Sequence, residues 1–366
     1  MNFNRRSILL GAFWLGSLFT LHAQAVEPDD NKKFAGAGFP APYSGSQAGR
    51  AVQSFPQSRE PDFKLAPPRR QVARLAPSSS ALGQNLTDAT ITANIYVETD
   101  YELFFKLGST VAGVQNYVAN LLTAVSNVYK RDANIVLRAS TIRVATSAVD
   151  PWTATTPNGM LDEVKLYWSS APEVDFERAA VLFLSGKTTD AGIAYVDAIC
   201  HKTPGVANYD PYDIAIASGL TGIVNNVAAA DTWDVIVVAH ELGHTFGSHH
   251  THCTAKTGGG GYYDMCENGE PSTGTHTCYA GTEVSTYGSI MSYCHQHPPV
   301  DGTGGSGMKN MNPLSFLNAA NDPAIKNVIR GGAEQWTTQN RSDGCLATSY
   351  PLQPTYMPGI LNLLTD

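Results

Sequence analysis

The chain has 366 residues, of which 43% are hydrophobic and 15% are charged, and its formal net charge is −8. This length and apolar content suffice for one sizeable core and for one or two domains. The negative net charge gives no support to nucleic acid as a partner and mainly favours solubility.

The first 25 residues have the three parts of a secretory signal peptide. Arg5 and Arg6 form a positive n-region, residues 8–21 form an apolar h-region, and Ala-Gln-Ala at 23–25 is a small-x-small cleavage site. The apolar run is short for a membrane-spanning helix of about 20 residues, and no later stretch is long and apolar enough to cross a bilayer. The arginine pair also loosely resembles a twin-arginine signal. We therefore expect a secreted or periplasmic protein without membrane contact after signal removal.

Residues 26–89 have the composition of a pro-segment or linker. They hold eight of the 21 prolines beside clusters of glycine and serine, so we expect this segment to be largely disordered. Eight basic and six acidic residues give it a net charge of +2, and this mildly basic leader could dock on the acidic remainder of the chain. The dibasic pair Arg69-Arg70 lies in this exposed stretch, which predicts a mature N-terminus between residues 65 and 92.

Strands alternate with helices from residue 90 onward, which predicts an α/β (α+β) fold in which helices cover a sheet. Polar and apolar residues alternate over 91–98 as in a strand, and apolar residues recur every three or four positions over 114–129 as in an amphipathic helix. The further strands that we expect are 135–144, 179–184, 192–196 and 212–217, and the further helices are 161–168 and 323–330. Gly331 and Gly332 are expected to end the last helix. Residues 346–366 form a tail without a clear pattern.

Residues 240–250 contain the pattern HExxHxxGxxH, with His240, Glu241, His244, Gly247 and His250 at its fixed positions. Two histidines four residues apart lie on one face of a helix, and imidazole pairs at this spacing bind zinc. Glu241 follows the first ligand and can act beside the ion as a general base.

The residues before this pattern are β-branched and would also suit a buried strand. We predict a helix because the ligand spacing requires one and because Asp231 and Asp234 suit an N-terminal cap.

The third histidine requires a break in the helix. In a continuous helix, His250 would lie about 240° around the axis from His244 and about 9 Å along it, facing away from the same ion. Gly247 lies between them and can adopt the left-handed conformation that ends a helix and reverses the chain. His249 is an alternative third ligand, but its offset does not fit the pattern.

All six cysteines lie between Cys200 and Cys345. An even number in an exported chain indicates disulfides, and a zinc–cysteine site is less favoured because no CxxC pair is present. The stretch 253–291 is expected to be mostly loop, and its glycine run at 258–261 does not match a phosphate-binding loop.

A methionine motif, Ser-Ile-Met-Ser-Tyr at 289–293, follows His250 by about 40 residues. Together with HExxHxxGxxH it resembles the metzincin zinc peptidases. Gly-Ile-Ala-Tyr at 192–195 followed by Cys200, and the continuation of the methionine motif into Cys294-His295, look most like the reprolysin (adamalysin-like) branch.

The resemblance implies a catalytic domain over 90–345 with a mixed five-stranded sheet. It implies a zinc cleft between a larger N-terminal subdomain and a smaller, loop-rich C-terminal one. One catalytic Zn2+ would be held by His240, His244 and His250, with Met291 as an apolar floor beneath it, although Met291 is also compatible with an ordinary core position. The resemblance also implies that Cys200 pairs with Cys345. The other four cysteines allow three pairings. The strand 192–196 would bind substrate by β-addition.

The chain departs from the reprolysin pattern at two points. Thr251 stands where these proteins usually have aspartate, and no cysteine precedes Cys200, so the usual zinc-blocking cysteine of the prodomain is missing. Tyr293 has the offset of a tyrosine that contacts zinc in the astacin branch, but the reprolysin-like surroundings favour a packed tyrosine without metal contact.

These observations predict a secreted zinc metalloendopeptidase that acts on protein or peptide substrates with Glu241 as general base. One alternative is a catalytically silent binding protein on a metzincin scaffold, against which the intact Glu241 and the three histidines argue. Another is a zinc hydrolase that acts on cell-wall peptides.

Overall fold

The computed structural model describes most of the region after residue 88 and two short pieces before it. The described residues are 24–25, 63–66, 89–170, 172–173, 176–189, 191–201, 211–224, 233–256, 261–268, 270, 277–282, 288–297, 310–311, 314–316, 324–340 and 344–349. The predicted signal peptide beyond residues 24–25, the Arg69-Arg70 pair and most of the glycine run lie outside these ranges.

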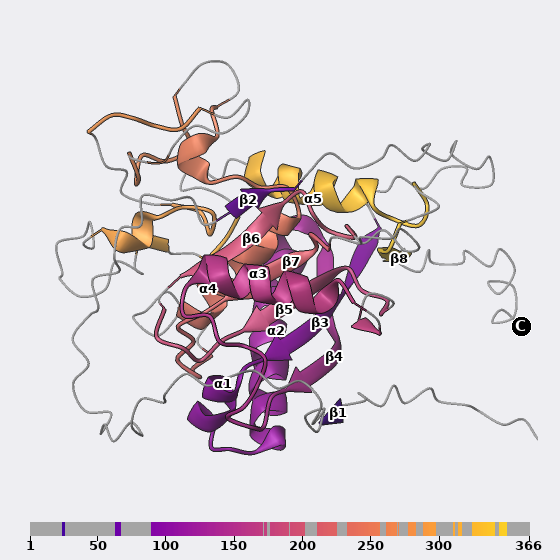
Figure 1. Ribbon diagram of the computed structural model, residues 1–366. Helices are drawn as coiled ribbons and strands as arrows, with labels where there is room; N and C mark the ends of the chain where they lie inside the picture. Colours follow the sequence, from indigo (N-terminus) through magenta and orange to yellow (C-terminus); the bar gives the residue numbers. More distant parts are fainter. Residues whose placement is uncertain are drawn as a thin grey trace, which may run out of the picture.

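One mixed sheet forms the centre of the structure, with strands in the order β1-β4-β3-β5-β7-β6-β2 and β8 paired with the first residues of β3 (Figure 1). The strands are β1 (Gln24–Ala25), β2 (Phe63–Leu65), β3 (Thr90–Thr99), β4 (Ile135–Val144), β5 (Ala180–Leu184), β6 (Gly192–Val196), β7 (Ile214–Ala217) and β8 (Ala347–Ser349).

The five longer strands are the mixed five-stranded sheet that the resemblance implied. β4, β3, β5 and β7 pair in parallel, whereas β6 pairs with β7 in the antiparallel direction. Each of these strands agrees with its predicted range to within two residues. The short strands β1, β2 and β8 were not predicted, and β2 and β8 lie in the segments that we expected to be linker and tail.

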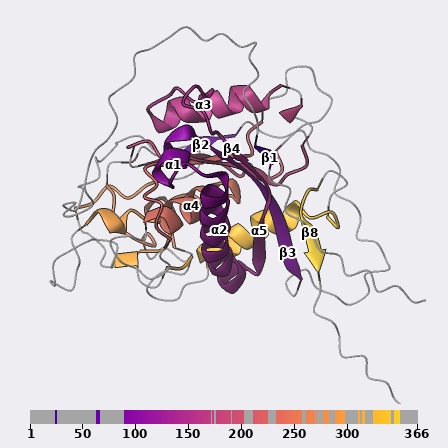
Figure 2. The same ribbon diagram turned by 90° about the horizontal axis from the view of Figure 1, so that it is seen from below.

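Helices cover both faces of the sheet. They are α1 (Tyr101–Lys106), α2 (Val111–Ala133), α3 (Pro157–Trp168), α4 (Trp233–Thr245) and α5 (Ala324–Gln335), with 3-10 turns η3 (Thr251–Cys253) and η4 (Cys294–Gln296). Figure 2 shows α3 on one face of the sheet and α2 and α4 on the other.

Alternate side chains of β5 enter two different apolar cores. Val181 and Phe183 pack with the residues of α3, whereas Leu182 and Leu184 pack with those of α2 and α4. Successive side chains of a strand point to opposite faces, and a parallel strand covered on both faces is therefore apolar throughout. This explains why β5 appeared in the sequence as a continuous apolar run.

α4 is a helix, as the ligand spacing predicted, but Asp234 does not act as its cap. Asp234 lies in the first turn, and its carboxylate accepts hydrogen bonds from the backbone N–H groups of Thr221 (2.8 Å) and Gly222 (2.9 Å) and from the Tyr117 hydroxyl (2.6 Å). It therefore ties α4 to the loop after β7 and to α2. Asp231 lies outside the described residues.

The prediction that Gly331 and Gly332 end the last helix is wrong, because α5 continues to Gln335. A Cβ atom at position 332 would lie 1.9 Å from the carbonyl oxygen of Phe246, just after α4. Gly332 therefore permits close packing between α5 and the chain that follows α4, and it is not a helix stop.

All six cysteines form disulfides, and none is free. Cys200 pairs with Cys345, as the resemblance implied. The open choice among the other four is resolved as Cys253–Cys278 and Cys266–Cys294. The first bridge fastens η3 to a later loop, and the second fastens the chain at Cys266 to η4, directly after the methionine motif.

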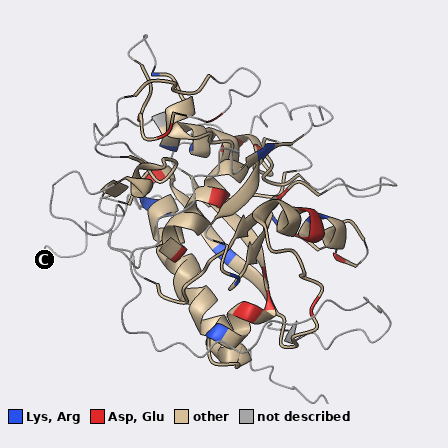
Figure 3. Cartoon of the chain, turned by 60° about the vertical axis from the view of Figure 1, so that its left-hand side comes forward, with Lys and Arg blue, Asp and Glu red and all other residues tan. Residues whose placement is uncertain are grey.

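Charged residues are interspersed over the helices and strands that the structure describes (Figure 3). Within the same residues, no helix combines the length and the apolar character needed to span a membrane.

The two neighbouring glycines of α5 give a matched test of this packing. Gly332→Ala should lower the free energy of unfolding by about 1–3 kcal/mol, because the added methyl overlaps the Phe246 carbonyl. Gly331→Ala should raise it by about 0.5–1 kcal/mol, because nothing lies within 4 Å of a Cβ there and alanine favours the helix. Urea denaturation of both variants measures the difference, and equal midpoints would contradict the packing role of Gly332.

Candidate metal centre

α4 positions the first part of the site. His240, Glu241 and His244 lie on its last two turns, and all three are at least 96% buried. The helix ends in a Schellman motif, with the N–H of Gly247 donating to the carbonyl of His244 (2.8 Å) and that of Ser248 donating to the carbonyl of Gly243 (3.0 Å). Gly247 has φ +101°, which confirms that glycine reverses the chain there.

The reversal brings His250 back to the helix. The Nε2 atom of His240 lies 3.1 Å from Nε2 of His244 and 3.2 Å from Nε2 of His250. The three imidazoles form a group whose nitrogen atoms could hold one ion. His249, the alternative third ligand, is not part of this group.

These distances fit a tetrahedral zinc site. With Zn–N bonds of 2.0–2.1 Å, two ligand nitrogens lie about 3.3 Å apart. The other ring nitrogen of each histidine faces an oxygen: Nδ1 of His240 lies 2.7 Å from the carbonyl of Ile290, Nδ1 of His244 lies 2.7 Å from the carbonyl of Ser248, and Nδ1 of His250 lies 2.6 Å from Oε2 of Glu270. Such contacts place the proton on Nδ1, so the unprotonated Nε2 can bind a metal.

The methionine motif contacts both parts of the site: α4, which carries His240, and the residue that follows His250. Ile290 provides the carbonyl that faces His240, and the next carbonyl, that of Met291, accepts the backbone N–H of Thr251 (2.9 Å) and its hydroxyl (3.0 Å). The Met291 side chain is fully buried and packs on α4, since a Cβ at Gly243 would lie 2.5 Å from its sulfur. Thr251, which departs from the reprolysin pattern, thus anchors the motif next to the third histidine.

Glu241 lies between α4 and the sheet. A Cβ atom at Gly192 would lie 2.3 Å from Oε1 of Glu241, so the first residue of β6 has room for this carboxylate only because it is glycine. The loop after β6 also binds the end of α4: the N–H of Asp197 donates to the carbonyl of His244 (3.0 Å), and that of Ala198 donates to the carbonyl of Thr245 (2.9 Å). The carboxylate therefore sits beside the strand that we expected to bind substrate.

Glu270 is a site residue that the sequence did not reveal. Its Oε2 lies 2.6 Å from Nδ1 of His250 and 2.5 Å from Nε2 of His252, and its side chain is 3% exposed. Burial alone would raise the pKa of Glu270, but the imidazoles of His250 and His252 together outweigh burial and hold that pKa well below its usual range. The carboxylate therefore orients the third histidine from a loop 20 residues away.

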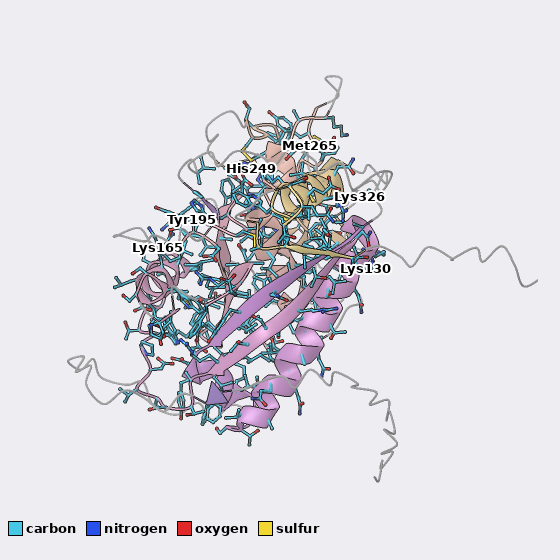
Figure 4. The ribbon with its side chains drawn as sticks, turned by 90° about the vertical axis from the view of Figure 1, so that its right-hand side faces the viewer. Lys130, Lys165, Tyr195, His249, Met265 and Lys326 are labelled. Carbon is cyan, nitrogen blue, oxygen red and sulfur yellow. A yellow bond between two sulfur atoms is a disulfide. The ribbon has the colours of Figure 1, made fainter. Side chains whose placement is uncertain are left out.

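Two aromatic rings flank the histidines. The ring centroid of Tyr293 lies 4.5 Å from that of His250 and 6.1 Å from that of His240. On the other side, Phe63 of β2 packs against the rings of His244 and His249, both at 5.1 Å. Figure 4 draws the side chains as sticks and labels His249 and, on β6, Tyr195. Phe63 comes from the predicted pro-segment, and no sequence pattern indicated its place here.

Comparison with known proteins adds the following. A profile of the metallopeptidase family M12 (Reprolysin_5) matches residues 89–305. No curated protein matches the chain. One similar solved structure is described as a chaperone–substrate complex; it has 12% identity and a TM-score of 0.31 and covers 65% of this chain and 36% of that one. The chain thus spans about a third of the length of that protein.

The Glu270 contact predicts an effect on metal affinity. Glu270→Gln should weaken zinc binding about 10–100-fold, because an amide orients His250 less firmly than a carboxylate does. Competition with a chromogenic chelator measures this affinity without reference to activity. Glu267→Gln makes the same chemical change in the same loop outside the histidine group and should leave the affinity unchanged; equal affinities of the two variants would contradict the role of Glu270.

Proposed function

The chain belongs to metallopeptidase family M12, and on this premise we propose that it is a secreted zinc-dependent endopeptidase that hydrolyses peptide bonds in protein or peptide substrates. The observation that carries the proposal is the approach of three Nε2 atoms, with separations of 3.1 and 3.2 Å from His240, next to the buried carboxylate of Glu241. The proposed zinc ligands are His240, His244 and His250, and Met291 supports them as part of the methionine motif.

A bound zinc ion lowers the pKa of a coordinated water molecule and polarises the scissile carbonyl. Glu241 is the proposed general base: it accepts a proton from the attacking water and returns it to the leaving amine. Glu241 is buried next to Gly192, so its carboxylate lies beside the first residue of β6, away from bulk solvent. The nucleophile is water, so no serine or cysteine is needed.

The edge of β6 is the proposed substrate site. β6 begins at Gly192, which directly faces Glu241, so a peptide that adds to this strand places its backbone beside the base. On the side away from β7, where β2 pairs with it in this structure, β6 offers a row of N–H and C=O groups that bind any extended peptide irrespective of its sequence. This supports action on protein or peptide substrates.

Export is supported by the cysteines. The three disulfides of the structure suit an oxidising compartment. The signal-like residues 1–25 are consistent with the same compartment.

Two substitutions separate proton transfer from metal binding. Glu241→Gln keeps the shape of the side chain but removes the base, so peptidase activity should fall by about 10²–10⁴-fold while zinc content and thermal stability stay near those of the wild type. His244→Ala should lose zinc as well as activity, because two ligands hold the ion poorly. An active Glu241→Gln protein would refute the assigned base.

Metal removal tests the proposed function as a whole. The purified protein should digest casein, lose this activity on treatment with a chelator and regain it when zinc is added, with about one zinc ion per chain. A parallel assay with muropeptides identifies a cell-wall hydrolase. Zinc binding without hydrolysis of any peptide, even after removal of the leader, would leave a binding protein instead.

A further inference from the structure

His252 is a buried histidine beside the metal centre that the proposed mechanism does not use. It is fully buried, and its Nε2 atom lies 2.5 Å from Oε2 of Glu270. The same oxygen lies 2.6 Å from Nδ1 of His250. A carboxylate oxygen that faces two imidazole nitrogens accepts a hydrogen bond from each. Two histidines therefore hold one oxygen of Glu270, and only His250 among them is a proposed zinc ligand.

A second carboxylate lies on the other side of the His252 ring. Nδ1 of His252 lies 4.0 Å from Oδ1 of Asp264, and both side chains are almost fully buried. Asp264 is itself held, because its Oδ1 accepts the backbone N–H of Cys266 (2.9 Å). Electrostatic attraction is stronger in such a buried place than in water. The carboxylates of Glu270 and Asp264 thus flank the ring and oppose its rotation.

The backbone and the neighbouring rings fix the place of His252. The next residue, Cys253, forms a disulfide with Cys278, and the carbonyl of His252 accepts the backbone N–H of Tyr279 (2.8 Å). The ring of His252 lies nearly parallel to that of His250, at 17° and with centroids 5.0 Å apart. His252 therefore reaches Glu270 from a position that does not depend on the ion.

We propose that His252 is a positioning residue for the metal. It holds Glu270 in place, and Glu270 in turn orients His250. This inference rests on the proposed function, since it takes His250 to be a zinc ligand. The outer partners of a metal-binding histidine set its orientation and basicity, and their loss lowers metal affinity. His252, supported by Asp264, therefore contributes to zinc affinity without touching the ion.

Two substitutions separate the hydrogen bond of His252 from its packing. His252→Phe keeps an aromatic ring beside His250 but removes the donor to Glu270, so zinc affinity should fall about tenfold. His252→Gln has a side-chain N–H that can replace Nε2 as the donor and should restore most of that loss. Competition with a chromogenic chelator measures the affinity. His201→Phe makes the same change at a buried histidine outside this cluster and should leave the affinity unchanged.

A double-mutant cycle tests whether His252 acts through Glu270. In a protein that already carries Glu270→Ala, His252→Phe should change the zinc affinity little, because the contact that it removes is already lost. Asp264→Asn provides a second variant should His252→Phe not fold: it removes the charge behind His252, should lower the affinity of the wild type, and should also have little effect beside Glu270→Ala.

The outcomes keep this inference separate from the proposed function. A wild type that binds zinc as tightly as His252→Phe and Asp264→Asn do would overturn the positioning role and leave the metal centre intact. Equal losses of affinity with and without Glu270→Ala would overturn it as well, because His252 would then act by another route. A wild type that binds no zinc would refute the metal centre, and the role of His252 with it.

Discussion

The convergence of three imidazoles on one point is the constraint on which the rest of this structure depends. A helix supplies two of them at its own spacing, but it directs the third position away, so the chain has to leave the helix between His244 and His250. The chain reverses at Gly247. Backbone N–H groups of the loop after β6 donate hydrogen bonds to the last carbonyls of α4. The same hydrogen bonds fix the strand nearest the site to the helix that carries the ligands.

The parts of the site that follow from local spacing could be predicted from the sequence. The positions of His240, Glu241 and His244 on one helix, the break at Gly247 and the five longer strands all depend on residues close in the chain, where periodicity determines the structure. Short-range patterns also led to one wrong prediction. A pair of glycines looks the same in the sequence whether it ends a helix or lets the helix pack closely against another segment.

Two contacts between distant segments could not be predicted. Glu270 lies in a loop without periodicity, and nothing in its neighbourhood marks it as the partner of His250. The β2 strand has only three residues in a proline-rich segment, which is too short for an alternating pattern to be detected. Both features depend on the tertiary structure. Glu270 has its place because a buried imidazole needs a hydrogen-bond acceptor, and β2 has its place because one edge of the sheet can accept a further strand.

The methionine motif presents two successive carbonyls to two different parts of the site, that of Ile290 to His240 and that of Met291 to Thr251. The chain between Thr251 and Ile290 is thereby held at both ends. The disulfides Cys253–Cys278 and Cys266–Cys294 hold its middle. Lengthening a loop with fixed ends costs little free energy, about 0.6 kcal/mol for each doubling. Insertions between these tie points should therefore reshape the surface around the site while the ligand geometry stays the same, which gives the fold a route to new substrate preferences.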